Sequence, residues 1–342
     1  MSRASLVRLA GAGLALVALH ELPLALNPYF VTILARIGIA IIAAVSLQLV
    51  NGFTGQFSIG HAGFMGLGAY ASAAFSVYLG AAALDALGGA RPAGLARLVY
   101  FPFPLVCGGA VAAAAGLVVA VPTLRLRGDY LAIATLGAGE IIRIAILNVD
   151  AVGGARGFSL ASAAHPGVDL RFDSLAGVYG VAALVIAAIA RLVYAGGGLA
   201  FRAVREDETA AESLGIATTR VKVEAFLVSS FFAGVAGALF AHSEGYIHTN
   251  SFSFVRSFEI VTFVVLGGLG SLSGAIVAAA VLTAAPELLR GLGEWRMILY
   301  SLLLIAAMIL RPQGLLGQRE LWPLSRIGAP EPREKADGVP RA

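Results

Sequence analysis

Residues 256–290 read RSFEIVTFVVLGGLGSLSGAIVAAAVLTAAPELLR, an apolar run of 35 residues. A helix needs about 20 apolar residues to cross a bilayer, so this run is too long for one simple crossing. Its middle is rich in small residues, namely Gly267, Gly268, Gly270, Ser271 and Gly274. They predict a turn at which the run folds back on itself. A helix broken at membrane depth is tolerated only where protein or a water-filled cavity covers its backbone, which predicts a pathway element near residues 266–274.

Composition places the rest of the chain in a membrane as well. Of 342 residues, 58% are hydrophobic and 13% are charged, whereas a soluble domain carries roughly 25% charged residues. This excludes a soluble globular protein. At about 20 residues per crossing, it predicts an all-α polytopic membrane helix bundle of about nine or ten spans, with broken or re-entrant helices. The other apolar runs cover 5–19, 29–50, 62–84, 101–121, 130–147, 175–194, 223–243 and 295–310.

The arginines and lysines predict the orientation. With the N-terminus in the cytoplasm, eight basic residues before position 250 lie on the inside and four lie outside, as the positive-inside rule expects. The tail after Arg311 is also basic, and it reaches the cytoplasm only if the 256–290 run crosses twice. We therefore expect a transmembrane domain over 1–316 and a partly disordered cytoplasmic tail over 317–342.

Several kinds of chemistry are not expected in this chain. Neither Lys222 nor Lys335 follows a glycine, so there is no Walker A loop to hold ATP. Cys107 is the only cysteine and the five histidines are scattered, which predicts neither a disulfide nor a metal site. No span contains a catalytic pair, so we expect no enzyme and no cofactor. The net charge of +4 is explained by orientation and does not indicate nucleic-acid binding.

A second glycine-rich stretch covers residues 51–70 and reads NGFTGQFSIGHAGFMGLGAY. Its glycines allow helix backbones to approach closely, which is one explanation of the stretch. The other is that an unwound segment lines a transport pathway, where its backbone dipoles and the polar side chains of Gln56, Ser58 and His61 meet the substrate. Both explanations remain open at the level of the sequence.

Ionisable residues inside spans are costly, at roughly 2.5 to 3.5 kcal/mol each, and need a reason. Glu140 and Arg143 are three residues apart and so share one helix face. They form either a self-neutralising pair inside the bundle or a polar station on a pathway. The candidate pathway residues are therefore Gln56, Ser58, His61, Glu140, Gly267, Gly268 and Gly270.

The cytoplasmic loop over 196–224 contains a short amphipathic segment, residues 202–215. Its small apolar face consists of Ala203, Val204, Ala210, Ala211 and Leu214, and Gly215 is placed to end the helix. Membrane-surface helices favour Lys and Arg on the polar face, but this one is rich in acidic residues. It therefore suits docking to a cytoplasmic protein better than binding to lipid.

Four motifs resemble the permeases of the branched-chain amino-acid ABC transporter family, specifically the LivM-type subunit. They are GQFSIGHA at 55–62, RGDYLAI at 127–133 with GEIIR at 139–143, REDE at 205–208, and LGGLGSLSG at 266–274. They occur in order across about residues 48–316. The segment Thr209-Ala210-Ala211 with Gly215 is similar to the E-A-A-x-x-x-G signature of importer coupling loops, with Thr in place of Glu.

The resemblance implies that residues 1–316 are the permease domain of an ATP-driven importer in a bacterial inner membrane. Its implied partners are a second homologous permease, two ATP-binding cassette subunits that hold the ATP, a periplasmic binding protein that delivers branched-chain amino acids, and membrane lipid. The implied coupling residues are Arg202, Arg205, Glu206, Asp207, Glu208, Ala211 and Gly215. Related permeases move urea, short amides or other small carboxylates, and a secondary transporter or channel is the alternative of a different class.

Overall fold

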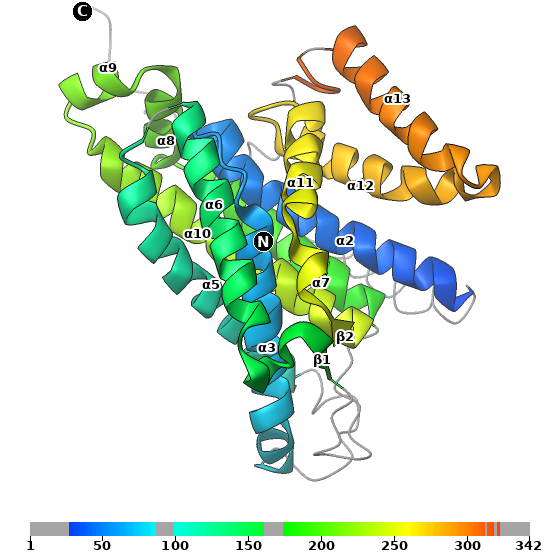
Figure 1. Cartoon of the computed structure of the whole chain (residues 1–342). Helices are drawn as coiled ribbons and strands as arrows, with labels where there is room; N and C mark the ends of the chain where they lie inside the picture. The colour runs from blue at the N-terminus through cyan, green and yellow to red at the C-terminus, as the bar shows by residue number, and fades with distance from the viewer. Residues whose placement is uncertain are drawn as a thin grey trace, which may run out of the picture.

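The computed structural model describes residues 27–86, 99–126, 128–160, 174–311, 313–317 and 320–321, with the backbone alone over 81–86. These residues form a bundle of long helices with short connecting elements (Figure 1). The longer helices are α2 (Pro28–Gln48), α3 (His61–Ala86), α5 (Pro102–Thr123), α6 (Asp129–Leu147), α7 (Leu175–Tyr194), α10 (Thr218–Glu244), α11 (Phe254–Gly267), α12 (Leu272–Leu288) and α13 (Trp295–Leu310). The predicted span over 5–19 and the tail from residue 322 lie outside the described residues.

Short elements join these helices. A π-helical turn, η1 (Leu49–Phe53), continues α2, and two short helices, α8 (Gly198–Glu206) and α9 (Glu208–Ser213), lie between α7 and α10. Four 3₁₀ turns are η2 (Asp150–Val152), η3 (Gly154–Arg156), η4 (Thr249–Phe252) and η5 (Arg290–Leu292). The two-residue strands β1 (Phe158–Ser159) and β2 (Tyr246–Ile247) pair antiparallel, with Phe158 opposite Ile247. Apart from this small pair, the described part of the chain is helical as predicted.

Among the described residues, seven helices are long and apolar enough to cross a membrane. They correspond to the predicted runs from 29–50 to 223–243 and to the second half of the 256–290 run. This makes the chain a multi-pass helical membrane protein, but it does not confirm the predicted count of nine or ten. With 14 residues, α11 rises about 21 Å, which is less than the roughly 30 Å of a bilayer's hydrocarbon core.

Helices α3, α5 and α10 pack closely against one another, and the buried core extends from them to α2, whose residues 38–48 are all buried. Small residues make this contact close: a Cβ on Gly68 of α3 would lie 2.3 Å from the Cα of Gly234 in α10. On the other side of α10, α2 packs against α7, α10 and α12. In Figure 1, α8 and α9 lie together at one end of the bundle, and α12 and α13 extend away from it. This arrangement leaves one face of α13 and both loop helices open to partners or lipid.

Candidate functional site

The 256–290 run is broken where its glycines predict a turn. Helix α11 ends at Gly267 and α12 begins at Leu272. Gly268 and Gly270 adopt φ angles of +111° and +92°, values that side chains with a Cβ rarely tolerate. The Ser271 hydroxyl then accepts a hydrogen bond from the Gly274 N–H at 3.0 Å and caps α12. The predicted turn is confirmed, while its place on a pathway remains a prediction.

The end of α2 lies against this break. The buried Gln48 side chain donates hydrogen bonds to the carbonyls of Gly268, at 2.8 Å, and Ser271, at 3.1 Å. Next to it, a Cβ on Gly52 would lie 2.7 Å from the Gly270 nitrogen. The two glycine-rich stretches are far apart in the sequence, since Gln48 and Gly268 are 220 positions apart, but they form one site. Gln48 was not among the predicted site residues. Its polar side chain within an apolar run could have identified it as a candidate.

A segment from the end of the chain covers the other side of the break. The N–H groups of Leu315 and Leu316 donate to the carbonyls of Leu266, at 2.7 Å, and Gly267, at 3.3 Å. These are carbonyls at the end of α11, which lack partners within the helix. The free carbonyls at the end of α11 are therefore satisfied by other parts of the protein.

Glu320 fixes the same segment to the start of α12. Its carboxylate accepts hydrogen bonds from the N–H groups of Leu272, at 2.7 Å, and Ser273, at 2.9 Å, and from the Tyr194 hydroxyl, at 2.7 Å. A carboxylate is well placed at a helix N-terminus, where free N–H groups and the helix dipole attract negative charge. The sequence contained no signal for this contact, because residue 320 lies in the predicted tail.

Arg205 joins the loop between α7 and α10 to the break. Its Nη1 atom donates to the Gly52 carbonyl at 3.0 Å. A Cβ on Gly270 would lie 2.5 Å from the same Nη1, and a Cβ on Gly55 would lie 3.3 Å from the Arg205 Cα. Only glycines leave room for this guanidinium, which contacts both glycine-rich stretches at once. The motif at 205–208 indicated the loop but not this contact.

The loop itself differs from the single helix expected over 202–215. Asp207 adopts an extended conformation, with φ −157° and ψ 110°, and ends α8. Its carboxylate then accepts hydrogen bonds from the Thr209 N–H, at 2.8 Å, and the Ala210 N–H, at 3.0 Å. Aspartate favours this capping role over a helix interior, so the segment divides into α8 and α9.

The end of α9 agrees with the prediction for Gly215. This glycine has a φ of +84°, and the Ile216 N–H donates to the Ala211 carbonyl at 3.0 Å, which is a Schellman motif. The apolar face is smaller than expected. Val204 and Ala211 are buried, but Leu214 is 81% exposed.

The predicted coupling residues divide into an anchored and an exposed group. Glu208 pairs with Lys222 of α10, and the Arg202 guanidinium lies 5.3 Å from the centre of the Tyr194 ring. By contrast, the Glu206 side chain is 78% exposed, and Asp207, Leu199 and Leu214 are exposed as well. One side of the loop is fixed to the bundle, while the other presents apolar and acidic groups to the outside.

Packing accounts for several glycines of the 51–70 stretch. A Cβ on Gly60 would lie 2.1 Å from the Thr135 carbonyl oxygen, and one on Gly63 would lie 2.5 Å from the Gly139 Cα. His61 is buried, and its Nε2 atom lies 2.8 Å from the Ser46 hydroxyl. These contacts favour the packing explanation for this part of the stretch.

Two other predicted pathway residues of this stretch, Gln56 and Ser58, are two positions apart in the sequence but differ in their surroundings. The backbone of Ser58 is held by Asn51, whose side chain accepts from the Ser58 N–H and donates to its carbonyl, both at 3.1 Å. Gln56 is also buried, but neither polar atom of its side chain has a hydrogen-bond partner among the described residues. An unpaired buried amide needs an explanation, and it keeps Gln56 the strongest pathway candidate of this stretch.

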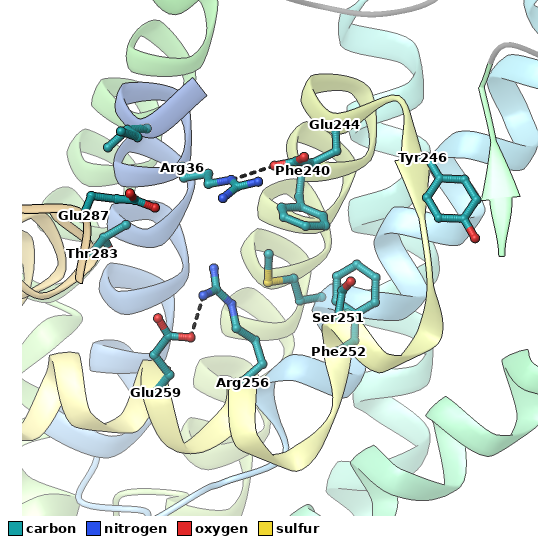
Figure 2. Close-up of a pocket in the computed structure, with 12 residues that line it drawn as sticks. Arg36, Phe240, Glu244, Tyr246, Ser251, Phe252, Arg256, Glu259, Thr283 and Glu287 are labelled. Carbon is teal, nitrogen blue, oxygen red and sulfur yellow. Dashed lines mark hydrogen bonds and ion pairs between the residues drawn. The ribbon is translucent and has the colours of Figure 1, made fainter. Parts of the chain in front are cut away.

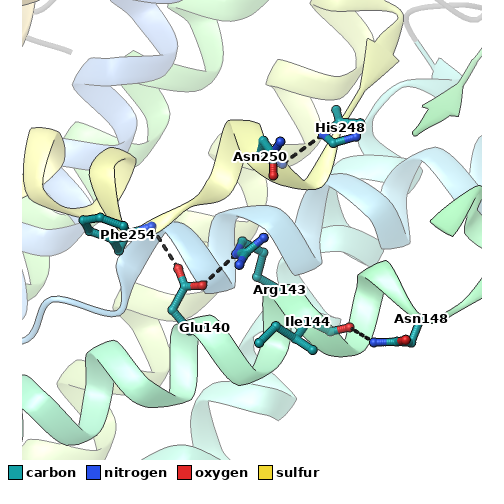
Figure 3. Close-up of polar contacts among 7 residues, drawn as sticks. All are labelled: Glu140, Arg143, Ile144, Asn148, His248, Asn250 and Phe254. Carbon is teal, nitrogen blue, oxygen red and sulfur yellow. Dashed lines mark hydrogen bonds and ion pairs between the residues drawn. The ribbon is translucent and has the colours of Figure 1, made fainter. Parts of the chain in front are cut away.

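Glu140 and Arg143 form the predicted ion pair, with 2.7 Å between Oε2 and Nε (Figure 3). The other carboxylate oxygen of Glu140 accepts the Phe254 N–H at 2.9 Å. The pair therefore also holds the start of α11 against α6. Within the part of the chain that the structure describes, no group of three His, Cys, Asp or Glu side chains could hold a metal ion.

Comparison with known families gives one match that covers most of the chain. The family described as "Branched-chain amino acid transport system / permease component" matches residues 29–310. This range includes every element of the site except the C-terminal segment that covers the break. No solved structure matches the chain.

Individual relatives are similar over shorter ranges. The high-affinity branched-chain amino acid transport system permease protein LivM of Salmonella typhimurium is 41% identical over 61% of this chain, and its Escherichia coli counterpart is 42% identical over the same share. The permease protein LivH of Salmonella typhimurium is 34% identical over 36% of this chain and 41% of its own length. The chain spans 55% of the length of either LivM protein.

Proposed function

Because the chain belongs to the family of branched-chain amino acid transport permeases, we propose that it is the membrane-spanning subunit of an ATP-driven importer for these amino acids. It pairs with a second, homologous permease in a bacterial inner membrane. Two ATP-binding cassette subunits bind and hydrolyse ATP on the cytoplasmic side, and a periplasmic binding protein delivers the substrate.

The contact between Arg205 and Gly52 carries this proposal. A loop that docks an ATPase must pass its movement to the pathway, and rigid elements in direct contact are the physical means of doing so. Arg205 lies in α8 and contacts both Gly52 and the α11–α12 turn. The loop is therefore in direct contact with the two segments for which the sequence offers a pathway role.

The exposed side of the loop supports the docking step. Leu199 and Leu214 are 68% and 81% exposed, and the acidic Glu206 lies between them in the sequence. Exposed apolar residues beside a solvent-exposed charge suit a docking surface, which has an apolar core and a polar rim. In the proposed cycle, closure of the ATPase pair pulls α8 and α9, Arg205 moves the turn, and the bundle passes between outward-open and inward-open states.

Uptake by the reconstituted complex tests the proposal. The chain is co-purified with its partner permease and ATPase subunits, placed in proteoliposomes, and supplied with the binding protein and ATP. We expect ATP-dependent accumulation of labelled leucine that isoleucine and valine reduce and urea does not. If urea were taken up equally well, the protein would be a permease for a different class of substrate. Uptake without ATPase subunits would identify a secondary transporter or channel.

A charge reversal tests the docking step separately. Because the Glu206 side chain is largely exposed, Glu206→Arg should leave the fold intact and weaken co-purification of the ATPase subunits. Glu294→Arg, at an exposed position just before α13, is the matched control. Unchanged co-purification and unchanged uptake in Glu206→Arg would remove the loop from the docking surface.

A further inference from the structure

A cavity of about 410 Å³ lies between α2, α10, α11 and α12 (Figure 2). Its volume falls in the range of pockets that hold small molecules, roughly 300–1,000 Å³. Glu244, at the end of α10, lines it. Lys222, which pairs with α9, lies 22 residues earlier in the same helix, a rise of about 33 Å. The cavity is therefore at the opposite end of the bundle from the cytoplasmic loop.

Two ion pairs border the cavity. Arg36 Nε lies 2.7 Å from Glu244 Oε1 and joins α2 to α10, while Arg256 Nη1 lies 2.6 Å from Glu259 Oε2 within α11. Figure 2 shows the two guanidinium groups facing the same space. A guanidinium has five N–H donors, and each of these pairs uses one. Both arginines thus keep donors for a further carboxylate.

The same cavity carries one more acidic group than basic groups. Glu287 of α12 also lines it, so three carboxylates face two guanidinium groups. The Glu287 carboxylate accepts a hydrogen bond from the Tyr29 hydroxyl and has no arginine partner among the described ion pairs. A bound cationic group would balance this charge. Charged groups in the membrane-spanning part of a transporter mark the substrate path.

Part of the remaining wall is apolar. Met65, Phe240 and Phe252 line the cavity, and Met65 and Phe252 are almost fully buried. Thr283 contributes a buried hydroxyl that has no hydrogen-bond partner among the described residues. The cavity thus combines donors for an anion, a surplus carboxylate for a cation and a surface for a hydrocarbon group.

We propose that this cavity binds a free zwitterionic α-amino acid with a branched apolar side chain. The α-carboxylate lies between Arg36 and Arg256, the ammonium group faces Glu287, and the side chain packs against Phe240 and Phe252. This site rests on the proposed import of branched-chain amino acids and gives that import a binding step within the permease. Ion pairs that only hold helices together would need neither the surplus carboxylate nor the cavity.

Photolabelling of the intact purified transporter, without binding protein, tests the site directly. The probe is a leucine analogue with a diazirine in its side chain, which labels what the side chain touches. We expect mass spectrometry to find the label on peptides that contain Met65, Phe240 or Phe252. Excess leucine should compete, whereas leucinamide and 4-methylpentanoate, which each lack one of the two charges, should not.

Variants test the charged groups. Arg256→Gln and Glu287→Gln should each lower labelling about tenfold or more, because each removes a charge-assisted hydrogen bond. Arg220→Gln is the control: it breaks the i,i+4 pair of Arg220 with Glu224, which lies at the opposite end of α10 from Glu244. The thermal unfolding temperature of each complex shows whether the variant is folded. The competition experiment on the wild-type protein tests the site without any variant.

The outcomes separate the site from the transport function. Three results would overturn the proposed site. They are the absence of label from these peptides, labelling that excess leucine does not reduce, and wild-type labelling in both Arg256→Gln and Glu287→Gln. If the same complex still imports leucine, the proposed function stands without it. Competed label in the cavity of a complex that imports no leucine would support the site and contradict the function.

Discussion

At the scale of single residues, the closest helix contacts depend on glycines that have no space for a side chain. Gly68→Ala would place a Cβ 2.3 Å from the Gly234 Cα, so α3 and α10 must separate. Overpacking of this kind costs about 1–3 kcal/mol, and we expect a lower unfolding temperature of the detergent-solubilised protein. Gly137→Ala is the control, because a Cβ at Gly137 of α6 meets nothing within 4 Å. A similar loss of stability in both variants would show that the close approach is not the cause.

Replacing the Gln56 side chain should affect the stability of the protein and its transport activity differently. Its buried amide lacks hydrogen-bond partners among the described residues, and such a group costs free energy that an apolar side chain would not. Gln56→Leu should therefore keep or raise the unfolding temperature while it lowers leucine uptake by the reconstituted complex. His61→Leu should instead lower the unfolding temperature, because Ser46 loses its imidazole partner. Normal uptake in Gln56→Leu would remove this residue from the pathway.

At the scale of elements, the division of the loop into α8 and α9 depends on one cap. Asp207→Ala removes the carboxylate that accepts the N–H groups of Thr209 and Ala210, a change that costs about 1 kcal/mol. We expect faster hydrogen exchange over residues 208–213 and unchanged exchange in α10. Asp207→Asn retains a capping oxygen and should restore most of the protection. Equal exchange in Asp207→Ala and the wild type would contradict the role of this cap.

The start of α12 depends on a carboxylate from the end of the chain. Glu320→Gln keeps the shape but removes the charge that meets the N–H groups of Leu272 and Ser273. A charge-assisted hydrogen bond contributes about 1.5–3 kcal/mol, so the segment around Glu320 should detach more often. Limited proteolysis near residues 313–321 should then become faster. Unchanged cleavage would mean that the N–H donors of Leu315 and Leu316 hold the segment alone.

The same scale shows what the sequence can predict. Apolar run length and glycine position located the described helices to within a few residues, because both depend only on neighbours along the chain. Helix α7 (Leu175–Tyr194) and helix α13 (Trp295–Leu310) begin and end where the runs do. The contacts of Gln48, Arg205 and Glu320 with the α11–α12 turn join residues far apart in the chain, which no local pattern encodes. The cap at Asp207 was missed because the spacing of Ala203 to Leu214 also fits one continuous helix.

At the scale of the whole molecule, the loop of α8 and α9 lies at one end of the bundle and the charged cavity lies at the other. The broken run and the π-helical end of α2 meet beside the loop, and α10 extends from Lys222 near α9 to Glu244 at the cavity. We therefore expect a movement of the loop to reach the helices that line the cavity. This geometry is what alternating access requires of a permease.

The ratio of leucine imported to ATP hydrolysed tests this coupling most directly. It is measured in proteoliposomes that contain the complete transporter, with Arg205→Gln compared with the wild type. The control is Arg220→Gln, whose side chain is 79% exposed in its pair with Glu224. We predict that Arg205→Gln keeps its ATPase subunits but imports at least about fivefold less leucine per ATP. This decrease corresponds to a coupling free energy of about 1 kcal/mol or more. A wild-type ratio in Arg205→Gln would contradict the connection between the loop and the pathway.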